Sequence, residues 1–181
     1  MFYLLYLAPL ISLMVTLYAT QILIRYLKRI GLVVKDQNKE EKPLVPLSGG
    51  LSVMSGILVG LMVYIFILTF IYNERTQIVQ ILAVTTTLLL ITFIGFMDDI
   101  IINKTKDSSV GLRQWQKPLL TLTAAVPLMV INAGTSHLLI PFFGRVDLGL
   151  LYPLILIPLG VVGSSNMVNL LAGINGLETG M

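Results

Sequence analysis

Long stretches of the chain carry no charged residue, and apolar residues dominate each of them. A helix of about 20 apolar residues crosses the roughly 30 Å hydrocarbon layer of a membrane. The pattern therefore predicts five transmembrane helices, with boundaries near residues 2–24, 51–72, 77–97, 118–132 and 148–167.

Composition supports lipid as the solvent. Of the 181 residues, 56% are hydrophobic and 12% are charged, against roughly 45–50% and about 25% in soluble domains. A soluble helical protein is the disfavoured alternative, because too little polar sequence remains to cover five apolar helices. The first stretch is interpreted as a retained helix rather than a signal peptide, since its positive charges follow the apolar run. The predicted fold class is an all-α integral membrane protein, with 1–181 as one membrane domain.

Positive charge is distributed unevenly between the connecting segments. Ten of the 12 Lys and Arg residues lie in the segments 25–50 and 98–117, and the other two are Arg75 and Arg145. The positive-inside rule places the two basic segments in the cytoplasm and the N-terminus outside. The closing segment 168–181 is then cytoplasmic as well.

An acidic pair, Asp98 and Asp99, closes the third apolar run. One interpretation is a helix that ends at the membrane interface with solvated acids. Acids at a helix C-terminus oppose the macrodipole, however, so two of them there favour a site that holds a cation or a proton. Adjacent helical residues point about 100° apart, which predicts separate tasks for the two carboxylates.

Amides and glycines follow the fifth apolar run. Asn166 and Asn169 lie three residues apart and share one helical face. An amide oxygen can complete a magnesium shell, but helix capping or a bond between helices would also explain the pair. Gly173 and Gly176 flank Asn175 and would let the backbone approach a flat or anionic ligand. A plain loop is the alternative.

Two lysines favour an anion site on the same face. Lys39 and Lys117 could be ordinary interfacial lysines, but Lys117 precedes Pro118 at a helix start, where the helix adds positive potential. A soluble, anionic, cytosolic substrate is the expected partner, and no nucleic acid is expected. The one histidine, His137, is interpreted as an ordinary residue of an outer loop. The chain has no cysteine, so no disulfide or thiolate metal site is expected.

Four segments, taken together and in order, resemble the polyprenyl-phosphate N-acetylhexosamine-1-phosphate transferases of the glycosyltransferase 4 type. They are "DQNK" with "VPLSGG", "GFMDDI", "LRQWQKPLLTLTAAVPLMVI" and "NMVNLLAGINGLETG". The last one is highly specific and is most similar to the eukaryotic and archaeal dolichyl-phosphate enzymes.

The resemblance implies transfer of GlcNAc-1-phosphate, or a similar amino-sugar-1-phosphate, from a UDP-sugar to polyprenyl or dolichyl phosphate. UMP is released, and the product begins a lipid-linked glycan, as in protein N-glycosylation. The reaction would take place at the cytoplasmic face of the cell membrane or the endoplasmic reticulum. The resemblance also implies Mg²⁺, with Mn²⁺ as a substitute, and is compatible with a homodimer in the lipid bilayer.

The resemblance assigns roles residue by residue. Asp98 and Asp99 fall on the acidic pair that serves the lipid phosphate, and Lys117 falls on a contact to that phosphate. Asn169 falls on a magnesium ligand, and Asn175 on a uracil contact. The remaining expected substrate contacts are Asp36, Gln37, Asn38, Lys39, Asn103, Asn166 and Gly173.

Three departures from the family pattern bear on these expectations. Leu47 stands where eukaryotic and archaeal members generally have glutamate, which leaves the amino sugar open. The segment between Asp99 and Lys117 is longer than in eukaryotic members. Asn103, which lies in this segment, is the expected counterpart of an asparagine of the family's substrate pocket. Members also have about ten helices, with a further aspartate and a basic loop in the second half. The chain alone is therefore expected to be inactive. The alternatives are half of a membrane transporter or a non-catalytic membrane subunit.

Overall fold

The fold is that of a computed structural model, which describes residues 3–35, 41, 43–105, 111–132, 136–141 and 144–171. The chain forms two compact units. One unit comprises Met1–Ile81 and Thr92–Arg113, and the other comprises Leu82–Ile91 and Gln114–Met181.

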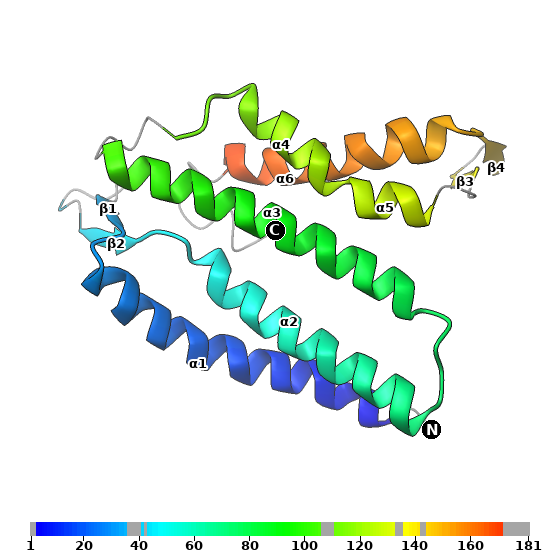
Figure 1. Ribbon diagram of the computed structural model, residues 1–181, viewed down its shortest axis with the longest axis horizontal. Coiled ribbons are helices and arrows are strands. Elements are labelled where there is room, and N and C mark those ends of the chain that lie inside the picture. Colours follow the sequence, from blue (N-terminus) through cyan, green and yellow to red (C-terminus); the bar gives the residue numbers. More distant parts are fainter. Residues whose placement is uncertain are drawn as a thin grey trace. The chain divides into compact units, whose positions relative to one another are not determined.

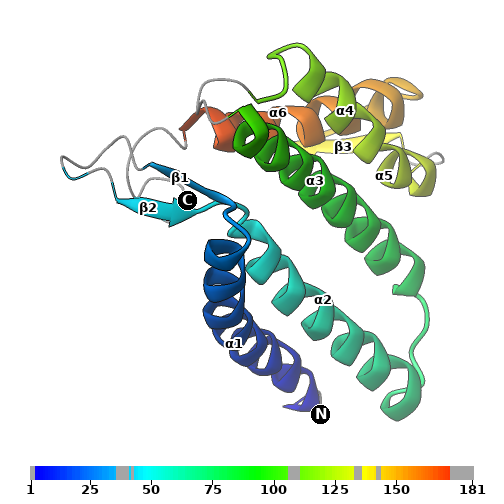
Figure 2. The same cartoon turned by 60° about the vertical axis from the view of Figure 1, so that its left-hand side comes forward.

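Two antiparallel helices pack against each other in the first unit, and they lie side by side in Figures 1 and 2. The helix α1 (Leu7–Arg29) is preceded by a 3-10 turn, η1 (Tyr3–Tyr6). The helix α2 (Gly50–Phe66) continues as a π-helical turn, η2 (Ile67–Ile71). The two ranges correspond to the first two apolar runs of the sequence.

Small residues allow α1 and α2 to approach closely. A Cβ at Gly60 would lie 2.7 Å from the Cβ of Ser12, and a Cβ at Gly56 would overlap the Thr16 hydroxyl. Since lipid tails are as apolar as leucine, membrane helices associate mainly by close packing and interhelical contacts, which small residues permit. The Gly56 and Gly60 spacing is therefore a packing feature of this pair.

Gly31 ends α1 and directs the chain into a hairpin. It has a φ of +74°, and its N–H bonds the carbonyl of Lys28 at 3.3 Å. The N–H of Leu32 bonds the carbonyl of Leu27 at 3.0 Å, which completes a Schellman motif. Leu27 and Leu32 are both buried. The strand that follows, β1 (Val33–Lys35), pairs antiparallel with β2 (Leu44–Pro46).

The helix α3 (Ile78–Thr105) is longer than its apolar run predicts. The expected end was Met97, but the helix continues through both aspartates, because Ile100 to Ile102 are compatible with a helix and no glycine or proline intervenes. Asp98 and Asp99 consequently lie about two turns before the end of the helix. The macrodipole argument made for these acids therefore does not apply, since that effect is confined to the last turn.

The second unit contains short, broken helices and a hairpin. The helix α4 (Gln116–Ala124) is followed by α5 (Val126–Ile131), and Pro127 lies in the first turn of α5. A π-helical turn, η3 (Tyr152–Leu156), leads into α6 (Ile157–Leu171), which packs against α4. In the sequence between α5 and η3, β3 (His137–Ile140) pairs antiparallel with β4 (Gly144–Asp147).

The expected helical membrane architecture is confirmed. In the described part of the chain, three helices are long and apolar enough to cross a membrane, namely Tyr3–Arg29, Gly50–Ile71 and Ile78–Ile102. Gln116–Ile131 and Tyr152–Met167 are shorter apolar helices. Large apolar side chains are widely exposed on these elements, including Phe70 at 75%, as a lipid environment requires. The two short hairpins were not predicted from the sequence.

Candidate functional site

Asp99 is held by a serine that lies far away in the sequence. The Ser48 hydroxyl donates a hydrogen bond of 2.7 Å to Oδ2 of Asp99, across 51 residues. Ser48 is 9% exposed and follows β2, directly before the start of α2, whereas Asp99 is half-buried on α3. The bond therefore fastens the segment before α2 to the acidic part of α3, within the first unit.

Asp98 is held by a segment that follows α3 in the sequence. Its Oδ1 accepts the N–H of Leu112 at 2.6 Å. A Cβ added to Gly111 would overlap Oδ1 of Asp98 and would lie 3.2 Å from Cγ1 of Ile102. Glycine at 111 thus lets the backbone come against the carboxylate. The two neighbouring aspartates thus bond different segments of the chain.

Lys117 lies in the second unit, in the first turn of α4, and is half-buried. Its backbone carbonyl accepts a hydrogen bond of 3.0 Å from the hydroxyl of Thr121. Trp115 precedes the helix at the N-cap position and is exposed. The expected helix N-terminus at Lys117 is therefore present, one residue into α4.

Asn166 makes a bond between two helices. Its Nδ2 donates to Oγ1 of Thr121 at 3.1 Å and to the carbonyl of Val162 at 2.8 Å. Thr121 is buried, and its hydroxyl also bonds the carbonyls of Lys117 and Pro118. Asn166 thus has the interhelical role that was the alternative to substrate binding. Thr121 was not predicted as part of this network, because a threonine in an apolar run carries no distinguishing pattern.

An apolar groove of about 420 Å³ lies between α4 and the η3–α6 segment. Leu119 and Leu122 line it from α4, and Leu154 and Leu159 line it from the other side. Trp115, two residues before Lys117, also lines it. The groove has the chemistry to hold a hydrocarbon chain, with a cation close by in the sequence.

The side chains of several predicted site residues are not among those that the structure describes. Asn103 lies on α3 and Asn169 on α6, and only their backbones are described. The others lie outside the described residues altogether; they are Asp36, Gln37, Asn38, Lys39, Gly173 and Asn175.

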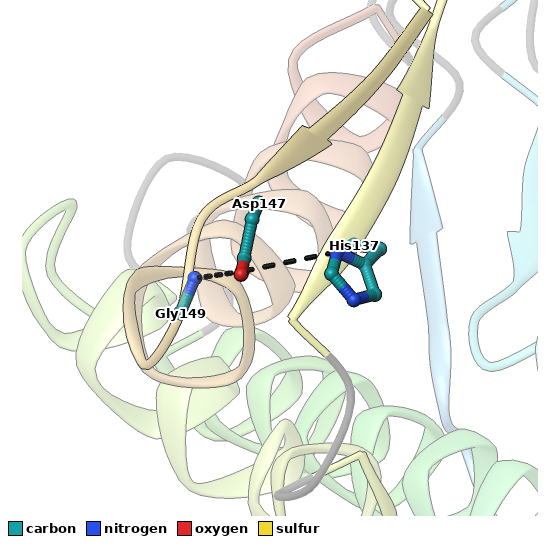
Figure 3. Close-up of polar contacts among 3 residues, drawn as sticks. All are labelled: His137, Asp147 and Gly149. Atoms are coloured by element: carbon teal, nitrogen blue, oxygen red, sulfur yellow. Dashed lines mark hydrogen bonds and ion pairs between the residues drawn. The ribbon is translucent and has the colours of Figure 1, made fainter.

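A third carboxylate, Asp147, lies in the hairpin of the second unit, where Figure 3 shows its contacts. Its Oδ1 accepts the N–H of Gly149 at 2.9 Å and lies 3.9 Å from Nδ1 of His137. The Gly149 N–H, with a smaller contribution from the Ser136 hydroxyl and a still smaller one from His137, lowers the pKa of Asp147 below its usual value. Both side chains of the pair are exposed, at 67% and 62%. His137 is therefore a strand residue in a surface pair.

The described residues offer oxygen donors for a hard cation at the acidic pair. Asp98 and Asp99 supply two carboxylates, the ligand type that Mg²⁺ prefers. Among the described residues, no group of three or more His, Cys, Asp or Glu side chains is arranged to hold a metal ion. The donor chemistry thus fits magnesium bound through one or two carboxylates together with phosphate oxygens of a substrate, rather than an all-protein cage.

Comparison with known proteins matches residues 81–181 to the model of glycosyl transferase family 4. A protein of Saccharolobus solfataricus is 37% identical over 172 residues, covering 95% of this chain and 49% of the relative. It is provisionally assigned as a UDP-N-acetylglucosamine–dolichyl-phosphate N-acetylglucosaminephosphotransferase. The Dictyostelium discoideum enzyme of that name is 30% identical, covering 80% of this chain and 37% of its own length.

A bacterial relative has a different named substrate. The phospho-N-acetylmuramoyl-pentapeptide-transferase of Thermotoga petrophila is 35% identical over 158 residues, covering 83% of this chain and 45% of its own length. The chain thus spans about half the length of the curated relatives it matches. The motifs, the helical membrane fold and these matches agree: the chain belongs to glycosyl transferase family 4.

Proposed function

We propose that the chain forms the N-terminal half of an enzyme that transfers an amino-sugar-1-phosphate from a UDP-sugar to a polyprenyl or dolichyl phosphate. GlcNAc-1-phosphate is the proposed group, UMP the leaving product, and the cytoplasmic face of the membrane the place of reaction. The product would begin a lipid-linked glycan. This proposal extends to the chain what the names of its relatives say of those proteins.

The arrangement of the acidic pair carries the proposal. Two half-buried carboxylates on a helix in a membrane protein are costly unless water, a cation or a partner compensates them. Asp98 and Asp99 are each held by a hydrogen bond from a separate segment, which fixes the positions of the two carboxylates. Such an arrangement suits the assembly of cations and phosphates better than simple solvation at a helix end.

The proposed reaction needs positioning more than proton transfer. An oxygen of the lipid phosphate attacks the β-phosphorus of the UDP-sugar, the new P–O bond forms, and the bond from that phosphorus to the UMP oxygen breaks. A phosphate monoester has a second pKa near 6, so the attacking group is already largely ionised at neutral pH. Asp98 and Asp99 therefore act by ordering cations around the phosphates rather than by removing a proton.

The second unit would supply the contacts to the lipid. Lys117 would neutralise the lipid phosphate, and the adjoining apolar groove would hold the first part of the polyprenyl chain. Thr121 and Asn166 would keep the first turn of α4 in place, because the Thr121 hydroxyl bonds the Lys117 carbonyl. Bound Mg²⁺, or Mn²⁺ in its place, would neutralise charge that develops on the diphosphate. Asn169 is proposed as one of its ligands, and Asn175 as a contact to uracil.

The activity of a fusion protein tests the proposal. The chain would be fused to the C-terminal half of the Saccharolobus solfataricus relative and expressed in membranes, then supplied with UDP-GlcNAc and dolichyl phosphate. The expected result is release of UMP together with a lipid-linked sugar. The 181-residue chain alone should release none, and turnover by the chain alone would contradict the proposal that it is one half of the enzyme. A fusion that is well folded and inactive with every amino sugar tried would count against the function itself.

The cytoplasmic location of the proposed face can be tested separately, because the chain has no cysteine. Single cysteines would replace Glu41, in the first basic segment, and Arg145, on the exposed strand β4. A membrane-impermeant maleimide added to whole cells should label Arg145→Cys and leave Glu41→Cys unlabelled until the cells are opened. The reverse pattern would contradict the proposed orientation.

A further inference from the structure

Ser48 has an unusual backbone for a serine. Its φ is +62°, in the left-handed region that favours glycine, and glycines follow it at positions 49 and 50. The residue is nevertheless a buried serine. A glycine at this position would adopt the same backbone with less strain, so the side chain itself must account for the serine.

The hydroxyl of Ser48 does not serve the helix that it precedes. A serine near a helix start commonly turns its side-chain oxygen toward the first unpaired N–H groups of that helix. Here the backbone carbonyl of Ser48 accepts the N–H of Leu51 at 3.1 Å, and the helix start is served without the side chain. The hydroxyl is directed instead to Oδ2 of Asp99, at 2.7 Å.

The neighbouring serines of α2 show the ordinary behaviour. Ser52 bonds the carbonyl of Gly49 at 2.8 Å, and Ser55 bonds the carbonyl of Ser52 at 2.7 Å. Both bonds stay within the first turns of α2. Ser48 is thus the serine of this group whose hydroxyl reaches another element, and the group it reaches is one of the two acidic side chains of the site.

We infer that Ser48 is a positioning residue that fixes the orientation of the Asp99 carboxylate for phosphoryl transfer. The Ser48 hydroxyl donates to Oδ2 of Asp99 and so fixes the rotation of the carboxylate. The direction in which Asp99 presents its oxygens to cations is then fixed as well. The inference rests on the proposed function, and it assigns to the "LSGG" segment a role that acts through Asp99 rather than through the substrate.

Two substitutions separate the hydroxyl from the backbone. Ser48→Gly removes the donor and relieves the positive φ, whereas Ser48→Ala removes the donor and keeps the strain. In the active fusion, both should lower kcat by about tenfold to a hundredfold, the loss expected for one hydrogen bond to a charged group. KM for the UDP-sugar and the lipid should stay unchanged, since a positioning residue acts through Asp99 rather than through either substrate. Ser55→Ala is the matched control and should keep normal kcat.

Thermal unfolding of the 181-residue chain in detergent tests the contact without any activity. Ser48→Ala, Asp99→Ala and the double variant form a cycle, and the two single losses should add up to more than the loss in the double variant. Additive losses would overturn the contact. Normal kcat in Ser48→Gly, or a raised KM with normal kcat, would overturn the positioning role. An inactive parent fusion would instead defeat the proposed function, and the unfolding cycle would still decide whether the bond exists.

Discussion

Asp98 and Asp147 make the same kind of hydrogen bond in very different settings. Oδ1 of Asp98 accepts the N–H of Leu112 at 2.6 Å, and Oδ1 of Asp147 accepts the N–H of Gly149 at 2.9 Å. The first bond joins residues 14 positions apart and is half-buried, whereas the second spans two positions on an exposed hairpin. A bond that closes a long loop in a poorly solvated place is costly to lose, while water replaces a local, exposed one.

Among the substitutions that test the contrast between Asp98 and Asp147, Asp98→Asn should have the largest effect. An asparagine oxygen can still accept the Leu112 N–H, so the loop stays fastened while the charge is lost. In the active fusion, kcat should fall by at least about a hundredfold, as when a charge-stabilising group is removed from an active site. UMP release measures it, and Asp147→Asn is the control with normal kcat. Near-normal turnover in Asp98→Asn would leave Asp98 only the task of holding the loop.

The substitution Gly111→Ala should disturb the same contact sterically. The new Cβ would overlap the Asp98 carboxylate and press on Ile102, so the backbone of the loop must move. The free energy of unfolding should fall by about 1–3 kcal/mol, the usual cost of overpacking. Chemical denaturation in detergent measures the change. Gly95→Ala on α3 is the control: its Cβ would meet nothing within 4 Å, and it should be neutral or stabilising. Equal behaviour of the two variants would show that the loop does not press on Asp98.

The substitution Asp147→Ala should have little effect, in contrast to Asp98→Ala. The N–H of Gly149 would bond water instead, because the hairpin side chains around it are exposed. The Tm of the chain should stay within error of the unsubstituted chain, while Asp98→Ala should lower it clearly. A large fall in Tm for Asp147→Ala would mean that the local hairpin bond matters as much as the long-range one.

The smallest expected effect is the response of the hairpin to acid. Since the folded state lowers the pKa of Asp147, its contribution to stability is present above the pKa of the unfolded chain and is lost as pH falls through the folded pKa. The amide resonance of Gly149 should therefore titrate with a midpoint below the ordinary aspartate value. His137→Ala should shift this midpoint only slightly, because the imidazole is the weakest of the causes. A midpoint at or above the ordinary value would contradict the hydrogen bond from Gly149.

The long uncharged stretches of the sequence predict the positions of the apolar helices, which make up much of the fold. The apolar run at 51–72 corresponds to α2 with η2, which together span Gly50–Ile71. The end of α3 was misplaced, because an acidic pair can end an apolar run without ending the helix that contains it. The hairpin β1–β2 was missed, since strands of three residues give too short a pattern to recognise.

The sequence singles out the candidate residues, but it does not indicate their hydrogen-bond partners. Asp98 and Asp99 are conspicuous as acids in an apolar chain, whereas Ser48 is a common residue whose importance comes from a contact across 51 positions. Gly111 is likewise explained only by the carboxylate beside it. Pairings over such distances depend on how the helices pack, which a pattern of hydrophobic and polar residues does not encode.

The length of α3 ties the acidic pair to the thickness of the membrane. The 20 residues from Ile78 to Met97, directly before the acidic pair, span about 30 Å, which equals the hydrocarbon thickness of a typical bilayer, and the whole 28-residue helix spans about 42 Å. In a thicker bilayer, hydrophobic mismatch would draw the carboxylates toward the acyl chains, and in a thinner one they would stand further into the headgroups. An enzyme built on this helix would therefore have an activity that depends on lipid chain length, even where the chemistry of its substrates stays the same.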